Sequence, residues 1–129
     1  MSEYPLGKPL SKEEAKLFVE QTVAIIGDKW SLLIIGELAF GKSPSRFNEL
    51  QRELSPISSR TLSIKLAKLC ENEIMQKTIE NASPPYTHYA LTEKGIGLVI
   101  AFKAMADWSL KWQNHPPLKP DKEHTSDSG

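Results

Sequence analysis

The stretch SPISSRTLSIKLAKL, residues 55–69, has the apolar spacing of a short helix with two unlike sides. At about 100° per residue, Leu62, Leu66 and Leu69 fall on one side, which we expect to lie in a core. Ser58 directly precedes this pattern and is the expected N-cap, because its hydroxyl can accept a hydrogen bond from the first helical turn. The opposite side is left for contact with a partner and carries Arg60, Ser63, Ile64, Ala67 and Lys68.

Two further short helices are expected just before this one. Asp28 is the expected N-cap of a helix that ends at Gly41, and Ser45 is the expected N-cap of the run RFNELQREL. The turn SPIS then leads into the helix that Ser58 begins. Three short helices in this order, with a tight connection between the second and the third, are typical of a helix-turn-helix unit.

The flanking segments extend this unit. Ser11 and Glu14 form a capping box for an earlier helix that ends at Gly27, a natural C-cap. On the other side, residues 74–80 and 87–92 are runs of β-branched and aromatic residues, and the two prolines of NASPPY between them cannot continue a strand ladder. We therefore expect a β-hairpin with a projecting loop.

A last helix is expected from the N-cap Thr92 through EKGIGLVIAFKAMADWSLKW. Its apolar residues cover more than one stripe of the helix circumference, so the helix must be buried on more than one side. In so small a domain the second cover is best supplied by a partner chain. We therefore predict a homodimer.

The composition allows one domain and no membrane span. The chain has 129 residues, of which 40% are hydrophobic, and this suits a single core. It has no run of about 18 apolar residues, and its polar N-terminus lacks the apolar segment of an export signal. We expect a cytoplasmic protein with a flexible arm at residues 1–10, one domain at 11–113 and a disordered, proline-rich tail at 114–129.

The sequence offers no pattern of catalysis or metal binding. Cys70 is the only cysteine, and His88, His115 and His124 are scattered, so no cluster has metal-ligand spacing and surface positions are expected for the histidines. The signatures G-x-S-x-G, P-loop, G-x-G-x-x-G and H-E-x-x-H are missing. We therefore predict that the chain is not an enzyme and has no catalytic residue, cofactor or metal.

Charge is balanced over the chain but not along it. The formal net charge is +0, which by itself speaks against a nucleic-acid binder. From Lys42 to Lys68, however, six basic residues stand against two acidic ones, a net charge of +4. Such a patch is enough to find a phosphate backbone, although a charge run is equally typical of a solvated face.

Two residues on the side away from the core bear on this choice. Arg60 lies near the helix N-terminus, where recognition helices place base-contacting residues. Ile64 is an apolar, β-branched residue on that side; a thymine methyl group in a major groove would explain it, and so would a lone surface isoleucine. The basic helix face, the preceding helix and the following hairpin together favour nucleic-acid binding.

Four motifs stand at matching places along the chain: G-x-K-W at 27–30, R-F-N-E-L at 46–50, I-S-x-R-T-L at 57–62 and Y-x-L-T-x-x-G at 89–95. Together they resemble the HxlR family of winged helix-turn-helix transcriptional regulators, over about Phe18 to Trp108. The resemblance implies a mainly α fold with a small β-hairpin and a dimeric, cytoplasmic, bacterial or archaeal DNA-binding protein. It also implies a recognition helix from Ser58 to about Cys70, a wing from Ile74 to Leu91 and dimer contacts from the first and last helices.

Two sets of site residues follow from this interpretation, in which a homodimer binds a pseudo-palindromic operator in double-stranded DNA. The dimerisation set comprises Phe18, Phe102, Met105, Trp108 and Trp112. The DNA-binding set comprises Lys42, Arg46 and Arg52 on the phosphate backbone, Arg60, Ser63, Ile64 and Lys68 in the groove, and also Ser58, Ser59, Thr61, Lys77 and His88.

The chain departs from the family pattern at several places. Leu17 stands where relatives often have a cysteine that senses oxidants or electrophiles, so the resemblance implies no thiol switch, and Cys70 is expected to be a partly buried structural residue. Tyr86 stands where relatives often have an arginine at the wing tip, and it cannot supply one. Glu73 replaces a usual glycine, so Asn72 is expected to take the left-handed turn.

Two alternatives stay open. The chain could be a winged-helix protein-interaction module that does not bind DNA, which the neutral net charge and the weakly basic wing favour. A small apolar effector is a candidate partner in a cleft lined by aromatic residues, and the same residues could instead be only dimer core: Phe18, Trp30, Phe102 and Trp108.

Overall fold

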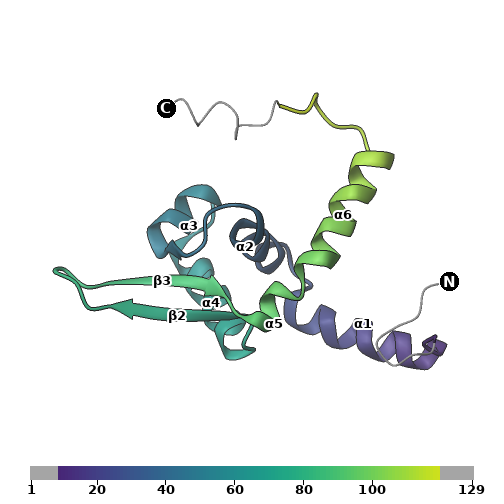
Figure 1. The fold of residues 1–129 in the computed structure, drawn as a ribbon, viewed down its shortest axis with the longest axis horizontal. Helices are drawn as coiled ribbons and strands as arrows, with labels where there is room; N and C mark the ends of the chain where they lie inside the picture. Colours follow the sequence, from purple (N-terminus) through teal and green to yellow (C-terminus); the bar gives the residue numbers. More distant parts are fainter. Residues whose placement is uncertain (1–8, 120–129) are drawn as a thin grey trace. The chain divides into compact units, whose positions relative to one another are not determined.

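A computed structural model describes residues 9–119 of the chain (Figure 1). Residues 1–8 of the predicted arm and 120–129 of the predicted tail, with His124, lie outside the described residues. The chain divides into two compact units, of which the first ends at Val99 and the second begins at Ile100. The described elements are α1 (Lys12–Ile26), α2 (Lys29–Phe40), β1 (Ser45–Arg46), α3 (Phe47–Glu53), α4 (Ser59–Glu71), β2 (Met75–Glu80), β3 (Tyr86–Leu91), α5 (Glu93–Ile96) and α6 (Val99–Trp112).

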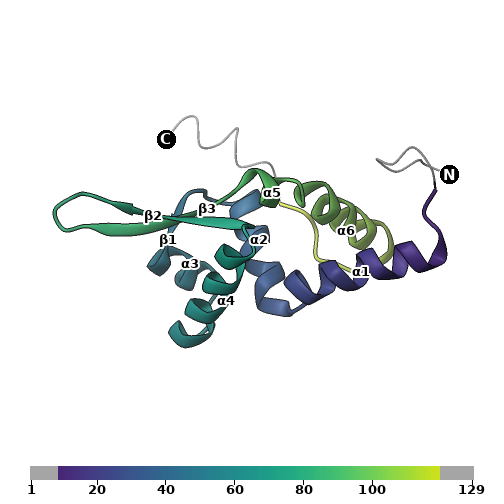
Figure 2. The ribbon, with the colours of Figure 1, turned by 90° about the horizontal axis from the view of Figure 1, so that it is seen from below.

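The first unit combines α1 to α5 with a three-stranded antiparallel sheet of order β1-β3-β2. Strands β2 and β3 form the predicted hairpin, in which Thr78 stands opposite His88 and Glu80 opposite Tyr86. Figure 2 shows α3 and α4 on one side of the sheet and the hairpin extending beyond them. The expected winged helix-turn-helix architecture, mainly α with a small β-hairpin as the wing, is confirmed.

The core of this unit lies where α2, α3 and α4 meet the start of the hairpin. Ile34 of α2, Leu50 of α3 and Leu62 of α4 have no exposed surface, and Met75 at the start of β2 is also buried. Burial stabilises the fold by about 1.5 to 3 kcal/mol for each such side chain. Helices α2, α3 and α4 are therefore held by packing on their inner sides.

Four predicted N-caps are confirmed. Ser11, Asp28, Ser58 and Thr92 each accept, through a side-chain oxygen, a hydrogen bond from the backbone N–H three residues later, at 3.0 to 3.1 Å. These bonds satisfy backbone donors that have no partner inside their helices. The starts of α1, α2, α4 and α5 are thus determined by local chemistry.

The prediction that Ser45 caps the third helix is wrong. Ser45 is buried and lies in the short strand β1, where it pairs with Tyr89 of β3. Its hydroxyl donates to the backbone carbonyl of Lys42 at 2.6 Å instead of facing the helix. Helix α3 begins only at Phe47, after the N-cap residue Arg46. The sheet therefore takes two residues that the local pattern had assigned to a helix.

The expected last helix is divided in two. Helix α5 starts at the predicted cap Thr92 but ends at Ile96, and α6 starts at Val99. Two glycines lie at the break, and each weakens a helix by about 1 kcal/mol relative to alanine. Gly95 is buried, and a Cβ there would stand 2.1 Å from the carbonyl oxygen of Ile74, so this close approach requires glycine.

The left-handed residue after α4 is Glu73, with φ 61°, and not Asn72 as predicted. Asn72 has φ −88°, because it is the C-cap and its side-chain amide donates to the carbonyl of Lys68 at 2.9 Å. The backbone N–H of Ile74 then returns to the carbonyl of Leu69 at 2.9 Å. This bond requires the reversal one residue later than expected, at the cost of strain in a non-glycine residue.

The second unit contains α6 from Ile100 onward and the chain that follows it. Residues 114–119 form no helix or strand and are exposed. Among residues 9–119, no helix has the length and apolar character that a bilayer crossing requires.

Candidate nucleic-acid interface

Helix α4 has the two sides that its sequence predicts. Leu62, Leu66 and Leu69 are buried. On the other side Ile64, a β-branched apolar residue, is 54% exposed. Arg60, Ser63 and Ala67 are also exposed beside it, whereas Lys68 is half-buried.

The hydroxyl groups at the start of α4 mainly organise the helix itself. Ser58 Oγ accepts the N–H of Thr61 and donates to Thr61 Oγ1 at 3.0 Å. Gln51 of α3 donates from Nε2 to Ser59 Oγ at 2.9 Å and so ties the two helices together. Gln51 is not among the predicted site residues, since a glutamine next to Leu50 has no distinguishing local pattern. The side-chain oxygen atoms of Ser58, Ser59 and Thr61 therefore all take part in hydrogen bonds at the start of α4, next to Arg60.

A partly buried ion pair anchors the middle of α4. Lys65 Nζ lies 3.1 Å from Asp28 Oδ2, the same oxygen that accepts the N–H of Ser31 at the start of α2. Burial disfavours the charged carboxylate, but hydrogen bonds from Ser31 and Lys65 outweigh it and lower the pKa of Asp28 to about 2. Lys65 therefore belongs to the support of α4 and not to its exposed face.

The charges at the junction of α2 and α3 partly cancel one another. Lys42 forms a salt bridge with Glu49. A surface cavity of about 310 Å³ brings Lys42 and Arg52 together with Glu37, Glu49 and Glu53. Burial and the neighbouring charge of Glu53 raise the pKa of Glu37. Lys42, expected on a phosphate, is thus already paired, while Arg52 is exposed at the rim of an acidic site.

The three-stranded sheet that includes the wing carries three of the predicted DNA-binding residues in different settings. Lys77 of β2 is exposed. His88 of β3 is half-buried, which corrects the expected surface position, and its Nε2 lies 2.6 Å from Glu80 Oε2. Arg46, opposite His88 in β1, places its guanidinium carbon 3.6 Å from the ring centroid of Tyr86.

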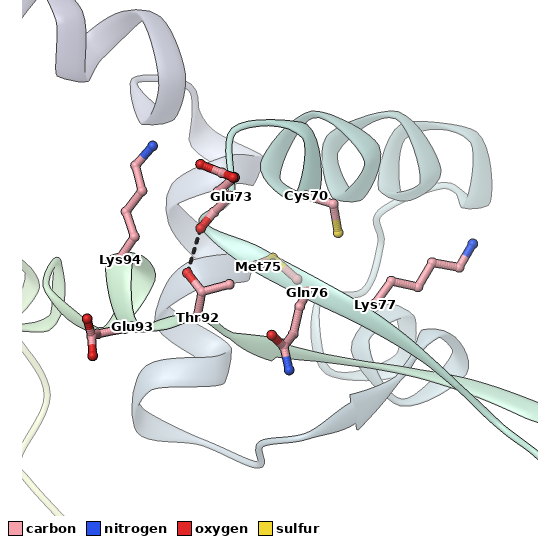
Figure 3. Close-up of a pocket in the computed structure, with 8 residues that line it drawn as sticks. All are labelled: Cys70, Glu73, Met75, Gln76, Lys77, Thr92, Glu93 and Lys94. Carbon is pink, nitrogen blue, oxygen red and sulfur yellow. Dashed lines mark hydrogen bonds between the residues drawn. The ribbon is translucent and has the colours of Figure 1, made fainter.

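Cys70 lies in an open cavity of about 460 Å³ at the base of the wing (Figure 3). Its side chain is half-buried, as predicted. Burial raises the pKa of the thiol, against a smaller opposite effect of Lys77. A protonated thiol is a poor nucleophile. In Figure 3, Lys77 and Lys94 point away from one another, so the cavity offers no converging pair of cations.

The predicted dimerisation residues divide into exposed and buried ones. Phe18 of α1 is exposed, and so are Met105, Trp108 and Trp112 of α6. Phe102 is only 8% exposed. The dimerisation role of these five residues stays a prediction.

The family model for the HxlR-like helix-turn-helix matches residues 25–117, most of the described chain. The chain belongs to the HxlR-like helix-turn-helix family. The resemblance seen in its motifs is thereby confirmed, and this HxlR-like chain is a helix-turn-helix transcriptional regulator with a DNA-binding fold.

Known relatives agree with this assignment. An uncharacterised HTH-type transcriptional regulator of Halalkalibacterium halodurans is 34% identical over 94 residues, which are 73% of this HxlR-like chain and 82% of the relative. The crystal structure of the HTH-type regulator YtcD has a TM-score of 0.70 at 29% identity, over 75% of this chain and 97% of the other. The quinone-bound structure of YodB from Bacillus subtilis has a TM-score of 0.63 at 31% identity, over 74% of this chain and 99% of the other.

Proposed function

We propose that this chain is a homodimeric transcriptional regulator that binds a pseudo-palindromic operator through two copies of α4. The observation that carries the proposal is the exposed face of α4, where Arg60 and Ile64 stand on a helix whose opposite side is buried in the core. A recognition helix needs such a rigid base, because its base contacts depend on side-chain position. The two half-sites would lie about 34 Å apart, one turn of DNA.

The contacts divide by position on this surface. Arg60 near the helix start and Ile64 one turn later would reach base edges, with the isoleucine against a thymine methyl group. Arg52 would contact a phosphate, and so would the backbone N–H groups at the start of α4. Because Lys42 and Lys65 are already paired with acids, they are not assigned to DNA.

Exposed apolar side chains on α1 and α6 support the dimer. Leu17, Phe18 and Val19 of α1 and Trp108 of α6 would each leave a large apolar surface in water in a single chain. A monomeric protein rarely exposes several large apolar side chains on neighbouring positions of one helix, as Leu17, Phe18 and Val19 are here. A second copy of the chain would cover them. Such a dimer would act in the cytoplasm, where a bacterial or archaeal chromosome lies, and no catalytic role is assigned to it.

A small apolar effector is the candidate signal. The structure of YodB with a bound quinone supports this class of ligand for a relative of the same fold. In this chain, Phe18 and Val23 contribute to a shallow apolar cavity of about 360 Å³ on α1. An effector would change DNA affinity only if it bound the two states of the dimer unequally.

The test is selection of bound sequences from a random duplex pool, followed by affinity measurements on the selected site at several salt concentrations. We expect a two-fold symmetric site and an affinity that falls steeply with salt. The double variant Arg60→Ala, Ile64→Ala should bind that site with a free energy less favourable by about 1 to 3 kcal/mol. Lys12→Ala, which removes an exposed charge from α1, is the matched control and should bind normally.

The alternative is a winged-helix module that binds a protein and not DNA. The salt bridges of Lys42 and Lys65 favour it, since they remove two cations from the basic window. Absence of enrichment for any duplex sequence, or operator binding that survives the double change in an intact dimer, would refute the α4 assignment and leave this module as the better account.

A further inference from the structure

The guanidinium of Arg46 is held at the wing although its backbone is not part of the hairpin. Arg46 lies in β1 and pairs with His88 of β3. Its guanidinium carbon lies 3.6 Å from the ring centroid of Tyr86, the first residue of β3 after the wing loop. A guanidinium over an aromatic ring at this distance makes a cation–π interaction, and arginine is well suited to tyrosine because its charged group is planar.

The backbone of Arg46 is fixed from the other side. Its N–H donates to Glu49 Oε1 at 2.8 Å, so the N-cap residue of α3 is also the last residue of β1. The side chain thus runs from the junction of β1 and α3 to the ring of Tyr86, where the wing loop joins β3. Two anchors, one on the backbone and one on the guanidinium, restrict the rotamers that a free surface arginine would sample.

The stacked guanidinium keeps its hydrogen-bonding capacity. Stacking uses the face of the group, whereas all five N–H donors point outward in its plane. Among residues 9–119, Arg46 has no salt bridge. The acid nearest to Tyr86 across the hairpin, Glu80, is paired with His88, and Glu49 carries the ion pair with Lys42. A positioned cation with free donors therefore remains beside the wing loop.

We propose that Arg46 and Tyr86 together form the DNA contact of the wing, with Arg46 donating to acceptor oxygens of the DNA beside the major groove that α4 occupies. Tyr86 is then a positioning residue, which acts only through Arg46. The inference rests on the proposed DNA-binding function and extends it. It also explains how a wing with tyrosine at the end of its loop presents an arginine: the cation comes from β1 and is held at the wing by the ring.

The acceptor oxygens belong either to a phosphate or to the base edges of a narrow minor groove, and both are reached from a wing. Replacing A·T pairs beside the half-site by G·C pairs separates these sources. A minor-groove contact makes wild-type binding sensitive to this change and Arg46→Gln binding insensitive. With a phosphate contact, neither protein's affinity depends on this base-pair change. The slope of log affinity against log salt concentration is then smaller by about one in the variant.

The positioning role is tested with three variants and a double variant on the selected operator. Arg46→Gln should weaken binding by about 10-fold, in the range of one charged contact. Tyr86→Phe keeps the ring and should bind within about two-fold of wild type, whereas Tyr86→Leu removes the stack and should weaken binding by about three-fold or more. In the Arg46→Gln background, Tyr86→Leu should have no further effect, because the ring acts through the guanidinium.

Thermal unfolding of each free protein shows whether the fold is intact. Tyr86→Leu binding equal to wild type, or an effect of Tyr86→Leu that adds fully to that of Arg46→Gln, would overturn the inference. If wild type binds its operator and Arg60→Ala, Ile64→Ala weakens it while these variants do not, this inference alone fails. If wild type binds no duplex at all, the proposed function itself fails.

Discussion

Asp28 connects the start of α2 to α4, and removing its charge should loosen the base of the candidate recognition helix. One carboxylate oxygen accepts the N–H of Ser31 and lies 3.1 Å from Lys65 Nζ. The informative change is Asp28→Asn, because asparagine is as good an N-cap as aspartate but carries no charge. Asp28→Ala removes both the cap and the charge, and Lys65→Met removes the partner.

The magnitude follows from the pKa. Burial disfavours the ionised carboxylate, and the hydrogen bonds from Ser31 and Lys65 more than offset it, so the pKa of Asp28 falls from 3.8 to about 2. The difference between these pKa values corresponds to at most about 2 kcal/mol of folding free energy. Because the side chain is 34% exposed, solvent screening reduces the contribution to about 1 kcal/mol.

The sign follows from the direction of the shift. The folded protein favours the ionised form, so this contribution is present above the unfolded pKa of 3.8 and disappears as the pH falls through about 2. Asp28→Asn should therefore be less stable than wild type by about 1 kcal/mol at pH 7, and the difference should fall to about half by pH 3. Asp28→Ala should cost about 1 kcal/mol more, because the cap is also lost.

The assay is urea unfolding followed by far-ultraviolet circular dichroism at pH 7, 4 and 3. All samples have one protein concentration, because unfolding of the proposed dimer would depend on concentration. Lys65→Met should resemble Asp28→Asn, and the double variant should be no worse than either alone. Equal stability of Asp28→Asn and wild type at pH 7, or a difference that is the same at pH 3 as at pH 7, would refute the reasoning.

Three further outcomes are expected. Glu73→Gly should raise the free energy of unfolding by about 1 kcal/mol, because glycine relieves the positive φ of 61°, and a loss of stability in urea would contradict this. Trp108→Glu should give monomers at micromolar concentration in sedimentation, since an unpaired charge in a dimer seam costs several kcal/mol; a monomeric wild type would remove the basis for it. Cys70→Ser should leave DNA affinity and its response to peroxide or diamide unchanged, because the raised pKa of the thiol keeps it protonated; a lost response would identify Cys70 as a sensor.

The sequence by itself determined the features whose partners are close along the chain. Ser58 caps α4 through Thr61, three residues on, and the same relation holds for the caps of α1, α2 and α5. The two sides of α4 follow from the period of the helix alone, and the hairpin follows from two β-rich runs about a proline turn. For these features the interactions between residues close in the sequence favour one local structure, and the packing of the core favours the same one.

Only the tertiary structure decided the features whose partners are distant. Ser45 has the chemistry of an N-cap, yet pairing with Tyr89 draws it into a strand. Neither the anchoring of Lys65 by Asp28 nor the stacking of Arg46 on Tyr86 has a signal at either residue. Each such contact stabilises the fold by about 1 kcal/mol. This is no more than the preference of a residue such as Ser45 for another local role, in its case that of an N-cap. Which of these contacts form therefore depends on how the helices and strands pack against one another. That packing is determined by the whole core and not by any single residue.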